Sequence, residues 1–255
     1  GGLDRVFEIN RNFRNEGADS THSPEFAMLE AYQAYGDYES IGALTRALIQ
    51  QAAQDAVGSL QIEHPDGTRI DLSGDWDRKS LYQLVSEAVG EQVTPQTPRA
   101  ELLRLAAAQD IPIAPRALDG KIVEELFDEL IVPTLIQPVF VMDYPLDTSP
   151  LVRAHRSEPG KVEKFDLYVN GMELATGYSE LVDPVVQRER LVAQAAERDR
   201  GDDEAMVLDE DFLAALEYGM PPTGGMGMGI DRLLSVLTGR GIRETILFPL
   251  VKPVS

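Results

Sequence analysis

The sequence contains no cysteine among its 255 residues, which excludes disulfide bonds, thiolate metal sites and cysteine nucleophiles. It also lacks any apolar run approaching about 18 residues, the length expected of a membrane-spanning helix. Positive charge is scarce, because 23 lysines and arginines stand against 43 acidic residues and the net charge is −20. Such a balance disfavours nucleic-acid binding over the whole surface. We expect a cytoplasmic protein whose segment here makes no membrane contact.

The composition is otherwise that of a globular protein, with 43% hydrophobic and 26% charged residues. We expect one domain over residues 1–255. Residues 1–4 run straight into strand-like sequence without an initiator methionine. This start predicts a piece of a longer protein, cut inside a domain, and a processed or tag-derived start is the alternative.

Hydrophobic periodicity predicts an α+β fold built from antiparallel hairpins with interspersed helices. Residues 5–14 alternate as a half-buried strand does, with Phe7, Ile9 and Phe13 on one face. Thr97 is expected to cap a helix that has Pro98 at its first position. Residues 62–75 are polar and are expected to form a surface excursion. Further strands are predicted over 25–35, 138–144, 162–169 and 172–178, and helices over 39–57, 80–89, 98–109, 120–131 and 184–200.

Familiar catalytic motifs are absent from the sequence. No Gly-Lys-Ser/Thr occurs, and the glycines at 224, 225, 227 and 229 do not fit the dinucleotide fingerprint. The three histidines are far apart and show no metal-ligand spacing. A Ser-His-Asp arrangement stays open, although no GxSxG nucleophile elbow is present.

Two acids are predicted to share one face of a hairpin. Asn170-Gly171 is a strong two-residue turn signal, so Tyr168 should pair with Glu173, and Asp166 with Ala175. Asp166 and Glu173 would then be diagonal neighbours about 7–8 Å apart at most. Such a pair suits a hard cation such as magnesium, and a solvated sheet face is the plain alternative.

Two arginines stand in places that suit an anion. Arg14 shares a strand face with polar neighbours, where its donors could hold a phosphate or form a surface salt bridge. The stretch GGMGMGIDR (224–232) removes side chains along a strand, so that a ligand can approach its backbone. Arg232 then falls in the first turn of a helix, where the backbone amides also favour an anion. The helix dipole does not stabilise a cation at this end, so a purely structural reason for Arg232 is less favoured. Glu30 and Tyr32 alternate in an otherwise apolar strand, and such an acid needs a cationic partner from a ligand or from the protein.

Three long segments together resemble class II aminoacyl-tRNA synthetases, and among them the lysyl-tRNA synthetases. RVFEINRNFRNEGADSTHSPEFAMLEAYQAYGDY (5–38) resembles the family's motif 2 and the strand after it. GMPPTGGMGMGIDRLLSVLTGRGIRETILFP (219–249) resembles motif 3. FDLYVNGMELATGYSELVDPVVQRER (165–190) is similar to the lysine-specific block between them. Aspartyl and asparaginyl relatives share the fold but resemble the chain less well.

The resemblance implies a class II catalytic fold with a six- or seven-stranded antiparallel sheet flanked by helices. It implies ATP-dependent activation of L-lysine to lysyl-adenylate, transfer to tRNA(Lys), Mg²⁺ as a cofactor and a homodimer. Carried over by residue, the catalytic groups would be Arg14 on the α-phosphate and Arg232 on the γ-phosphate. The remaining ATP-site residues would be Glu16, His22, Phe26 stacked on adenine, Glu173 and Gly229. Magnesium would bind to Asp166 and Glu173. The residues in contact with lysine would be Glu30, Tyr32, Thr176, Tyr178 and Glu180.

The chain departs from the family pattern at several places. Three features of the family would lie before residue 1. They are motif 1, which forms the dimer interface, one further acid that contacts lysine, and the anticodon-binding OB-fold, which makes many of the contacts to tRNA. Thr176 stands where asparagine is usual, Tyr178 where phenylalanine is, and Asp166 where glutamate is common. An alternative keeps lysine activation in a paralogue that serves lysyl-phosphatidylglycerol synthesis or protein lysylation. A catalytically inactive, synthetase-like binding protein is disfavoured by the intact arginines and carboxylates.

Overall fold

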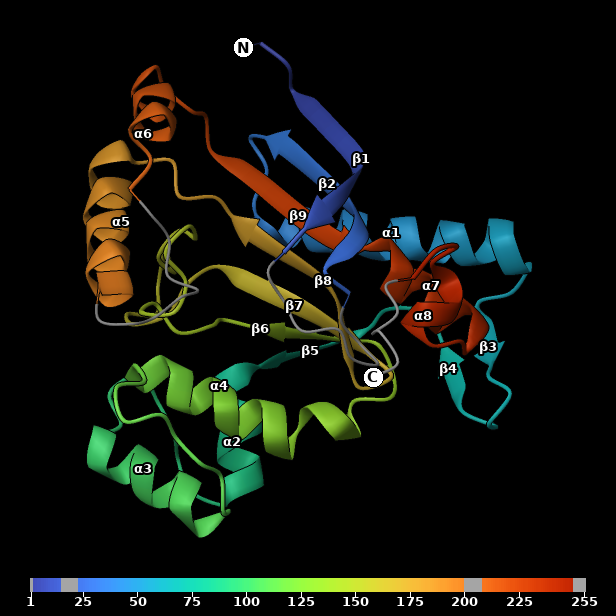
Figure 1. The fold of residues 1–255 in the computed structure, drawn as a ribbon, viewed down its shortest axis with the longest axis horizontal. Helices are drawn as coiled ribbons and strands as arrows, with labels where there is room; N and C mark the ends of the chain where they lie inside the picture. Colours follow the sequence, from blue (N-terminus) through green and yellow to red (C-terminus); the bar gives the residue numbers. More distant parts are fainter. Residues whose placement is uncertain (1, 15–22, 200–207, 250–255) are drawn as a thin grey trace, which may run out of the picture.

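The computed structural model describes residues 2–14, 23–199 and 208–249, with the side chains of 196–199 excepted. Its centre is a seven-stranded sheet in the order β1-β2-β9-β8-β7-β6-β5 (Figure 1). Neighbouring strands are antiparallel except for β5 and β6, because helices α2 to α4 intervene and return the chain to run in the same direction. Helices lie on both faces, so the α+β prediction is confirmed.

The predicted elements occur within a few residues of their expected bounds. The strands are β1 (Arg5–Phe13), β2 (Glu25–Ala34), β3 (Gln61–Glu63), β4 (Arg69–Asp71), β5 (Asp77–Ser80), β6 (Val139–Met142), β7 (Lys164–Val169), β8 (Met172–Ser179) and β9 (Thr223–Gly229). The helices are α1 (Tyr38–Val57), α2 (Leu81–Val89), α3 (Arg99–Ala108), α4 (Asp119–Leu130), the 3₁₀ turn η1 (Val132–Thr134), α5 (Pro184–Asp199), α6 (Glu210–Glu217), α7 (Ile230–Thr238) and α8 (Ile242–Thr245).

Helix α1 begins and ends at residues whose chemistry suits helix termini. Asp37 accepts a hydrogen bond from the Ser40 amide at 3.0 Å, and the Ser40 hydroxyl accepts one from the Asp37 amide at 2.9 Å. Gly58 ends the helix at φ 77°, a left-handed conformation that glycine adopts without steric cost. The apolar stripe of α1 lies against one face of the sheet and contributes Ile41 and Ile49, both fully buried.

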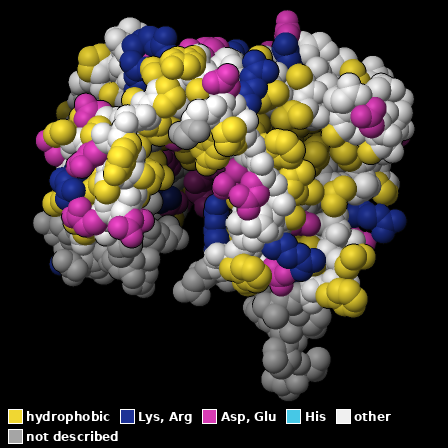
Figure 2. Space-filling view, turned by 90° about the horizontal axis from the view of Figure 1, so that it is seen from above, with side chains coloured by type: hydrophobic (Ala, Val, Ile, Leu, Met, Phe, Trp, Pro, Cys, Tyr) yellow, Lys and Arg dark blue, Asp and Glu magenta, His cyan; other side chains and the backbone are white. Residues whose placement is uncertain are grey.

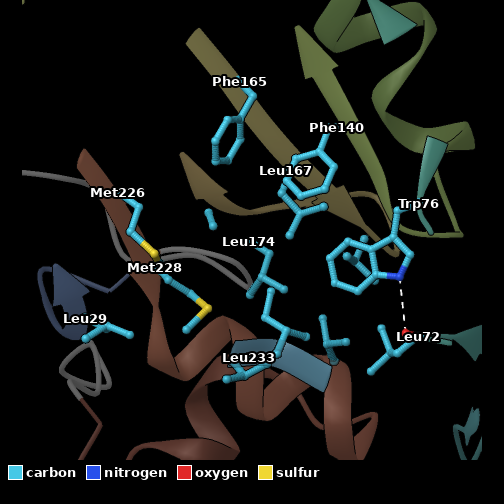
Figure 3. Close-up of a cluster of buried hydrophobic side chains, with 14 of the residues drawn as sticks. Leu29, Leu72, Trp76, Phe140, Phe165, Leu167, Leu174, Met226, Met228 and Leu233 are labelled. Carbon is cyan, nitrogen blue, oxygen red and sulfur yellow. Dashed lines mark hydrogen bonds between the residues drawn. The ribbon is translucent and has the colours of Figure 1, made fainter. Parts of the chain in front are cut away.

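That face of the sheet carries the first hydrophobic core, part of which is drawn in Figure 3. Phe140 of β6 packs edge-on against Phe165 of β7, with ring centroids 5.0 Å apart. Trp76 lies 5.7 Å from Phe140, and its indole nitrogen donates to the Leu72 carbonyl at 3.2 Å. Each large side chain buried here contributes about 1.5–3 kcal/mol of transfer free energy. Helices α1 and α7 cover this core.

The opposite face carries a second core over only half of its width. Helices α2, α3 and α4 lie beneath the β5–β6–β7 end of the sheet (Figure 1). Val139 and Val141 point into this core whereas Phe140 points into the first, as the alternation of a strand requires. Phe127 of α4 meets Tyr168 of β7 edge-on at 5.3 Å. On the same face, β8, β9 and β2 are not covered by these helices, and the predicted site residues lie there.

The hairpin β3–β4 replaces the expected surface excursion. Its turn at Asp66-Gly67 forms as predicted, with Gly67 at φ 88°. Ile62 and Ile70 pair across the two strands and are buried in the first core. The hairpin therefore packs against the core through these two isoleucines, although most of its residues are polar.

The start of α3 differs from the prediction. The helix begins at Arg99 with Pro98 as its cap residue, and the Pro98 carbonyl accepts from the Leu102 amide at 3.1 Å. The Thr97 hydroxyl accepts instead from the amide of Thr94 at 2.8 Å. It closes a preceding turn and is therefore not the N-cap.

Strand β1 is exposed, although its pattern predicts a half-buried strand. The side chains of Phe7, Ile9 and Phe13 are 74%, 62% and 74% exposed. Their alternation is correct, but β1 is the edge strand and nothing among the described residues covers its apolar side. Figure 2 shows groups of hydrophobic side chains on both sides of a hollow in the surface. Among the described helices, none is long and apolar enough to cross a membrane.

Candidate active site

The hairpin β7–β8 forms with its predicted turn. Asn170 and Gly171 have φ values of 53° and 69°, as a two-residue turn of this class requires. Tyr168 pairs with Glu173 as expected. The pairing then shifts, because Leu174 has no partner on β7 and forms a β-bulge.

The bulge corrects the predicted register beyond it. Asp166 pairs with Thr176, and not with Ala175. Leu174 and Ala175 are both buried in the first core, so two consecutive side chains point the same way. Asp166 and Glu173 still share the open face, and each adds to the other's electrostatic environment.

The same bulge decides where Glu180 points. Regular alternation from Glu173 would place Glu180 on the opposite face, so the lysine role assigned to Glu180 predicts a bend or bulge after Gly177 that turns it inward. The reversal occurs earlier, at Leu174, so that Thr176, Tyr178 and Glu180 follow one another on the open face. Gly177 lies on the core face, where an added Cβ would collide with the Phe165 ring.

Glycines of β9 leave space in the middle of this face. Gly227 lies between Glu30 of β2 and Thr176 of β8, and Gly225 lies between Tyr32 and Tyr178. A Cβ added to Gly225 would collide with the Glu180 carboxylate and lie 2.8 Å from the Tyr32 ring. The alternating glycines thus keep backbone at the centre and side chains around it.

A cavity of about 230 Å³ lies at one end of this open face. Arg14, which follows β1, places its guanidinium 5.1 Å from the Phe26 ring centroid and 3.9 Å from the Met28 sulfur. Six of the predicted site residues line this cavity, namely Arg14, Phe26, Glu173, Thr176, Gly229 and Arg232.

Helix α7 positions the second arginine. Gly229 ends β9 and is the cap residue of α7, so Arg232 lies in the first turn as predicted. Its Nη1 donates to the Glu173 carbonyl at 2.7 Å, which ties α7 to β8. Asp231 accepts from the Ala27 amide at 2.9 Å and ties the same turn to β2. Both arginines line the cavity, and Arg232 does so from a helical turn that is tied to β8 and β2.

The two predicted metal-binding acids have different surroundings. Asp166 is 3% exposed, and both of its oxygens are engaged. Thr176 donates to Oδ1 at 2.5 Å, and the Lys164 ammonium lies 2.9 Å from Oδ2. Glu173 lines the cavity, whereas Asp166 does not. Burial and the neighbouring Asp166 raise the pKa of Glu173, and Lys164, Arg232 and Arg14 oppose that rise.

A second group of acids lies farther along the open face. Burial, followed by the charge of Glu30, raises the pKa of Glu180 to about 7. Burial and these two acids also raise the pKa of Tyr32 to about 12. No cation of the described residues contributes to either shift. An arriving ammonium group would relieve this unbalanced charge.

Most of the predicted site residues are thus gathered on one face of the sheet. Glu16 and His22 lie outside the described residues. Strand parity indicated the hairpin acids, Arg14 and the acid-tyrosine pair, and the predicted helix start indicated Arg232. Neither signal indicated Lys164 or Asp231. Lys164 could have been found, because it is two residues from Asp166 on the same strand and must share its face. Asp231 accepts a hydrogen bond from a backbone amide, and no pattern in the sequence around it indicates this role.

One other group among the described residues has metal-like spacing: Asp143, His155 and Glu158. The Nδ1 atom of His155 accepts from the amides of Ser157 and Glu158, at 3.2 and 2.9 Å. In the neutral ring, Nε2 must then carry the hydrogen, and this atom faces Asp143 at 3.7 Å. The arrangement is a hydrogen-bonded loop closure, and its histidine offers no lone pair to a metal.

The chain is similar to known proteins over nearly its whole length. The family model of class II tRNA synthetases (D, K and N) matches residues 1–252. The chain is 65% identical over 254 residues to a lysine–tRNA ligase of Kineococcus radiotolerans, covering 99% of the chain and 51% of the relative. It is 56% identical to the enzyme of that name from Mycobacterium tuberculosis, covering 100% of the chain and 52% of the relative. A lysylphosphatidylglycerol biosynthesis bifunctional protein of Nocardia farcinica is 51% identical over 99% of the chain and 23% of its own length.

The chain spans about half the length of the lysine–tRNA ligases that it matches. The match of the family model extends over nearly all of the chain, and the arginines and carboxylates of the resemblance meet on one open sheet face. The chain belongs to the class II tRNA synthetases (D, K and N).

Proposed function

We propose that the protein activates L-lysine with ATP to form lysyl-adenylate and transfers the lysine to tRNA(Lys). The observation that carries this proposal is the continuity of two unlike regions on one sheet face. A cavity with two arginines adjoins a cluster of acids whose charge no described cation balances. The first region suits a polyphosphate, and the second suits an amino acid with a cationic side chain.

The two arginines would act on the phosphates. Lysine's carboxylate attacks the α-phosphorus, a bond from lysine oxygen to phosphorus forms, and pyrophosphate leaves. Negative charge grows on the α-phosphoryl oxygens during this step, and a guanidinium fixed beside them stabilises that charge. We assign this role to Arg14, and the γ-phosphate to Arg232. Phe26 would stack on adenine. Gly229 would complete the ATP site together with Glu16 and His22, which lie outside the described residues.

Magnesium fits the acidic side of the cavity. Glu173 and Asp166 stand on one face, and their mutual repulsion raises the pKa of the Glu173 carboxyl. Oxygen donors in a region of excess negative charge are what this ion prefers. When bound with ATP, it would neutralise phosphate charge, held beside Glu173, which lines the cavity, with Asp166 adding negative charge behind it.

The lysine side chain would lie across the glycines of β9. Glu30 and Glu180 would meet its ammonium group, with Tyr32 beside them. Thr176 and Tyr178 extend from the neighbouring strand toward the same space. Because the Thr176 hydroxyl already donates to Asp166, it offers the substrate its lone pairs and not its hydrogen.

Partners would include tRNA(Lys) and a second subunit. The acidic net charge of this chain suits a tRNA grip that lies largely in another domain of the full-length protein. The apolar side chains of β1 support a homodimer or an intramolecular cover at this edge, because such side chains are seldom left in water. Aminoacylated tRNA is consumed by ribosomes, so the reaction would take place in the cytoplasm.

A second candidate keeps the same chemistry and changes the destination of the lysine. The similarity to the Nocardia farcinica bifunctional protein favours it, since that relative is named for lysylphosphatidylglycerol biosynthesis. Protein lysylation is a further destination. The site described here would serve all three destinations, because each begins with lysyl-adenylate.

Lysine-dependent exchange of pyrophosphate into ATP by the full-length protein tests the activation step. We expect exchange with lysine and none with aspartate or asparagine, the other amino acids of this family. Charging of tRNA(Lys), measured with radiolabelled lysine, tests the transfer. Exchange without charging of tRNA would favour another lysine acceptor, and no lysine-dependent exchange would refute the proposed function.

A further inference from the structure

Lys164 is an internal cation beside the proposed metal site. Its side chain is 19% exposed, and its ammonium lies 2.9 Å from Asp166 Oδ2. The ammonium also lies 4.1 Å from the Tyr144 ring centroid, on the face where an aromatic ring attracts a cation. Burial disfavours its charge, but Asp166, followed by Tyr178, Glu173 and Glu124, outweighs burial and raises the pKa of Lys164.

Asp166 is held on both sides by the protein. Thr176 occupies one carboxylate oxygen at 2.5 Å and Lys164 the other at 2.9 Å. With 3% exposure, this carboxylate has almost no surface left for an arriving ligand. Glu173 differs, because its side chain is only partly buried and lines the cavity.

We propose that Lys164 is a positioning residue whose ammonium takes the place of a metal ion at Asp166, which leaves Glu173 as the carboxylate that contacts the divalent cation. Lys164 and Thr176 together fix Asp166, and Asp166 in turn fixes the Thr176 hydroxyl at the boundary between the phosphate and lysine regions. The inference rests on the proposed function only in its choice of metal site.

Helix α4 is linked to this arrangement through Glu124. Its carboxylate accepts from the Thr148 hydroxyl at 2.6 Å, and Lys164 lowers its pKa against the larger effect of burial. Lys164 therefore acts electrostatically on an acid of the site and on an acid of the helical layer.

Binding of Mn²⁺ alone to the full-length protein tests the proposal without relying on catalysis. Free Mn²⁺ is followed by electron paramagnetic resonance at pH 8. We expect Glu173→Gln to weaken binding by about tenfold or more, because it removes the contacting carboxylate. We expect Lys164→Met to tighten binding by about tenfold, because it releases an Asp166 oxygen to the metal.

The double variant Lys164→Met with Asp166→Asn keeps the net charge of the site unchanged. It tests whether Asp166 serves as a partner of Lys164 or as a ligand of the metal. If Lys164 serves in place of a metal, this double variant should bind Mn²⁺ within about threefold of the unmodified protein, since the net charge of the site is preserved. Lys164→Arg should also preserve the affinity. Thermal unfolding of each variant shows whether the fold is retained.

Several results would overturn the proposal. One is a double variant that binds Mn²⁺ as weakly as Glu173→Gln does. Another is a folded Lys164→Met variant whose affinity for Mn²⁺ does not rise. The third is the absence of Mn²⁺ binding by the unmodified protein. If Lys164→Met fails to fold, the comparison of Glu173→Gln with the double variant still decides. The expected metal results without lysine-dependent exchange would refute the proposed function and leave the role of Lys164 standing.

Discussion

Glu173 lies in β8 and Glu180 directly follows that strand; both face the same side of the sheet, yet their surroundings are opposite. Burial raises the pKa of both carboxyl groups. Around Glu173, the cations Lys164, Arg232 and Arg14 oppose that effect, whereas around Glu180 the only charge from the described residues that contributes is that of Glu30. The region proposed to bind phosphate thus carries its own counter-charges, whereas in the region proposed to bind lysine no described cation balances the acids.

The strongest test of this comparison is to offer a substrate without the charge. Norleucine has the alkyl stem of lysine and no ammonium group, so it would leave Glu30 and Glu180 unpaired. Sites built for a polar partner reject analogues that lack it by factors on the order of 10⁴. We expect this discrimination in kcat/KM for exchange, and equal use of norleucine and lysine would show that the acids do not recognise the side chain.

The second test removes a counter-charge from the phosphate region. Arg14→Ala should lower the exchange rate at saturating ATP by about 100-fold or more, the effect of losing one transition-state donor. Arg11→Ala is the matched control, because Arg11 lies three residues before Arg14, in β1, is exposed and pairs with Glu25. Near-normal turnover by the Arg14 variant, or an equal loss in the control, would remove Arg14 from the mechanism.

The third test measures what the unbalanced acid costs the free protein. A carboxyl whose pKa is raised to about 7 contributes stability below its unfolded pKa, and this contribution is lost as the pH rises through 7. Glu180→Gln should therefore raise the free energy of unfolding at pH 8 by an amount on the order of 3 kcal/mol. At pH 4 the two proteins should differ little. Denaturant unfolding at both pH values checks this, and a variant that is less stable at pH 8 would contradict it.

The smallest effect expected is the pH dependence of lysine binding. Below pH 7 the Glu180 carboxyl takes up a proton and no longer attracts the ammonium group. The KM for lysine should rise as the pH falls, approaching about tenfold per unit well below the pKa. In Glu180→Gln the KM should be higher at pH 8 and nearly independent of pH from 6 to 8. A KM profile that is the same in both proteins would assign the titration to another group.

Periodicity and turn chemistry were sufficient to predict most elements. The Asn170-Gly171 turn and the helical stripe of α1 are local signals, so their elements appear where expected. The bulge at Leu174 is not local, because it depends on how β8 fits between β7 and β9. Strand alternation alone therefore gave the right face for Asp166 and Glu173, and the wrong place of reversal for Glu180.

Other differences have the same origin in tertiary contacts. Lys164 reads as an ordinary strand lysine until Asp166 and Tyr144 are placed around it. The apolar residues of β1 alternate correctly, but burial depends on what lies beyond the edge of the sheet. The proposed roles of Glu16 and His22, and the extent of a single domain over residues 1–255, stay predictions.

The unpaired Leu174 is the one residue that β8 could lose without turning its later side chains over. Deleting it would remove the bulge, so that Glu173, Ala175 and Thr176 alternate regularly and each keeps its present partner on β7. Deleting a residue between Thr176 and Glu180 would instead turn every side chain between that point and Glu180 to the other face. In the full-length protein, single-residue deletions should therefore be recovered at Leu174 far more often than between Thr176 and Glu180.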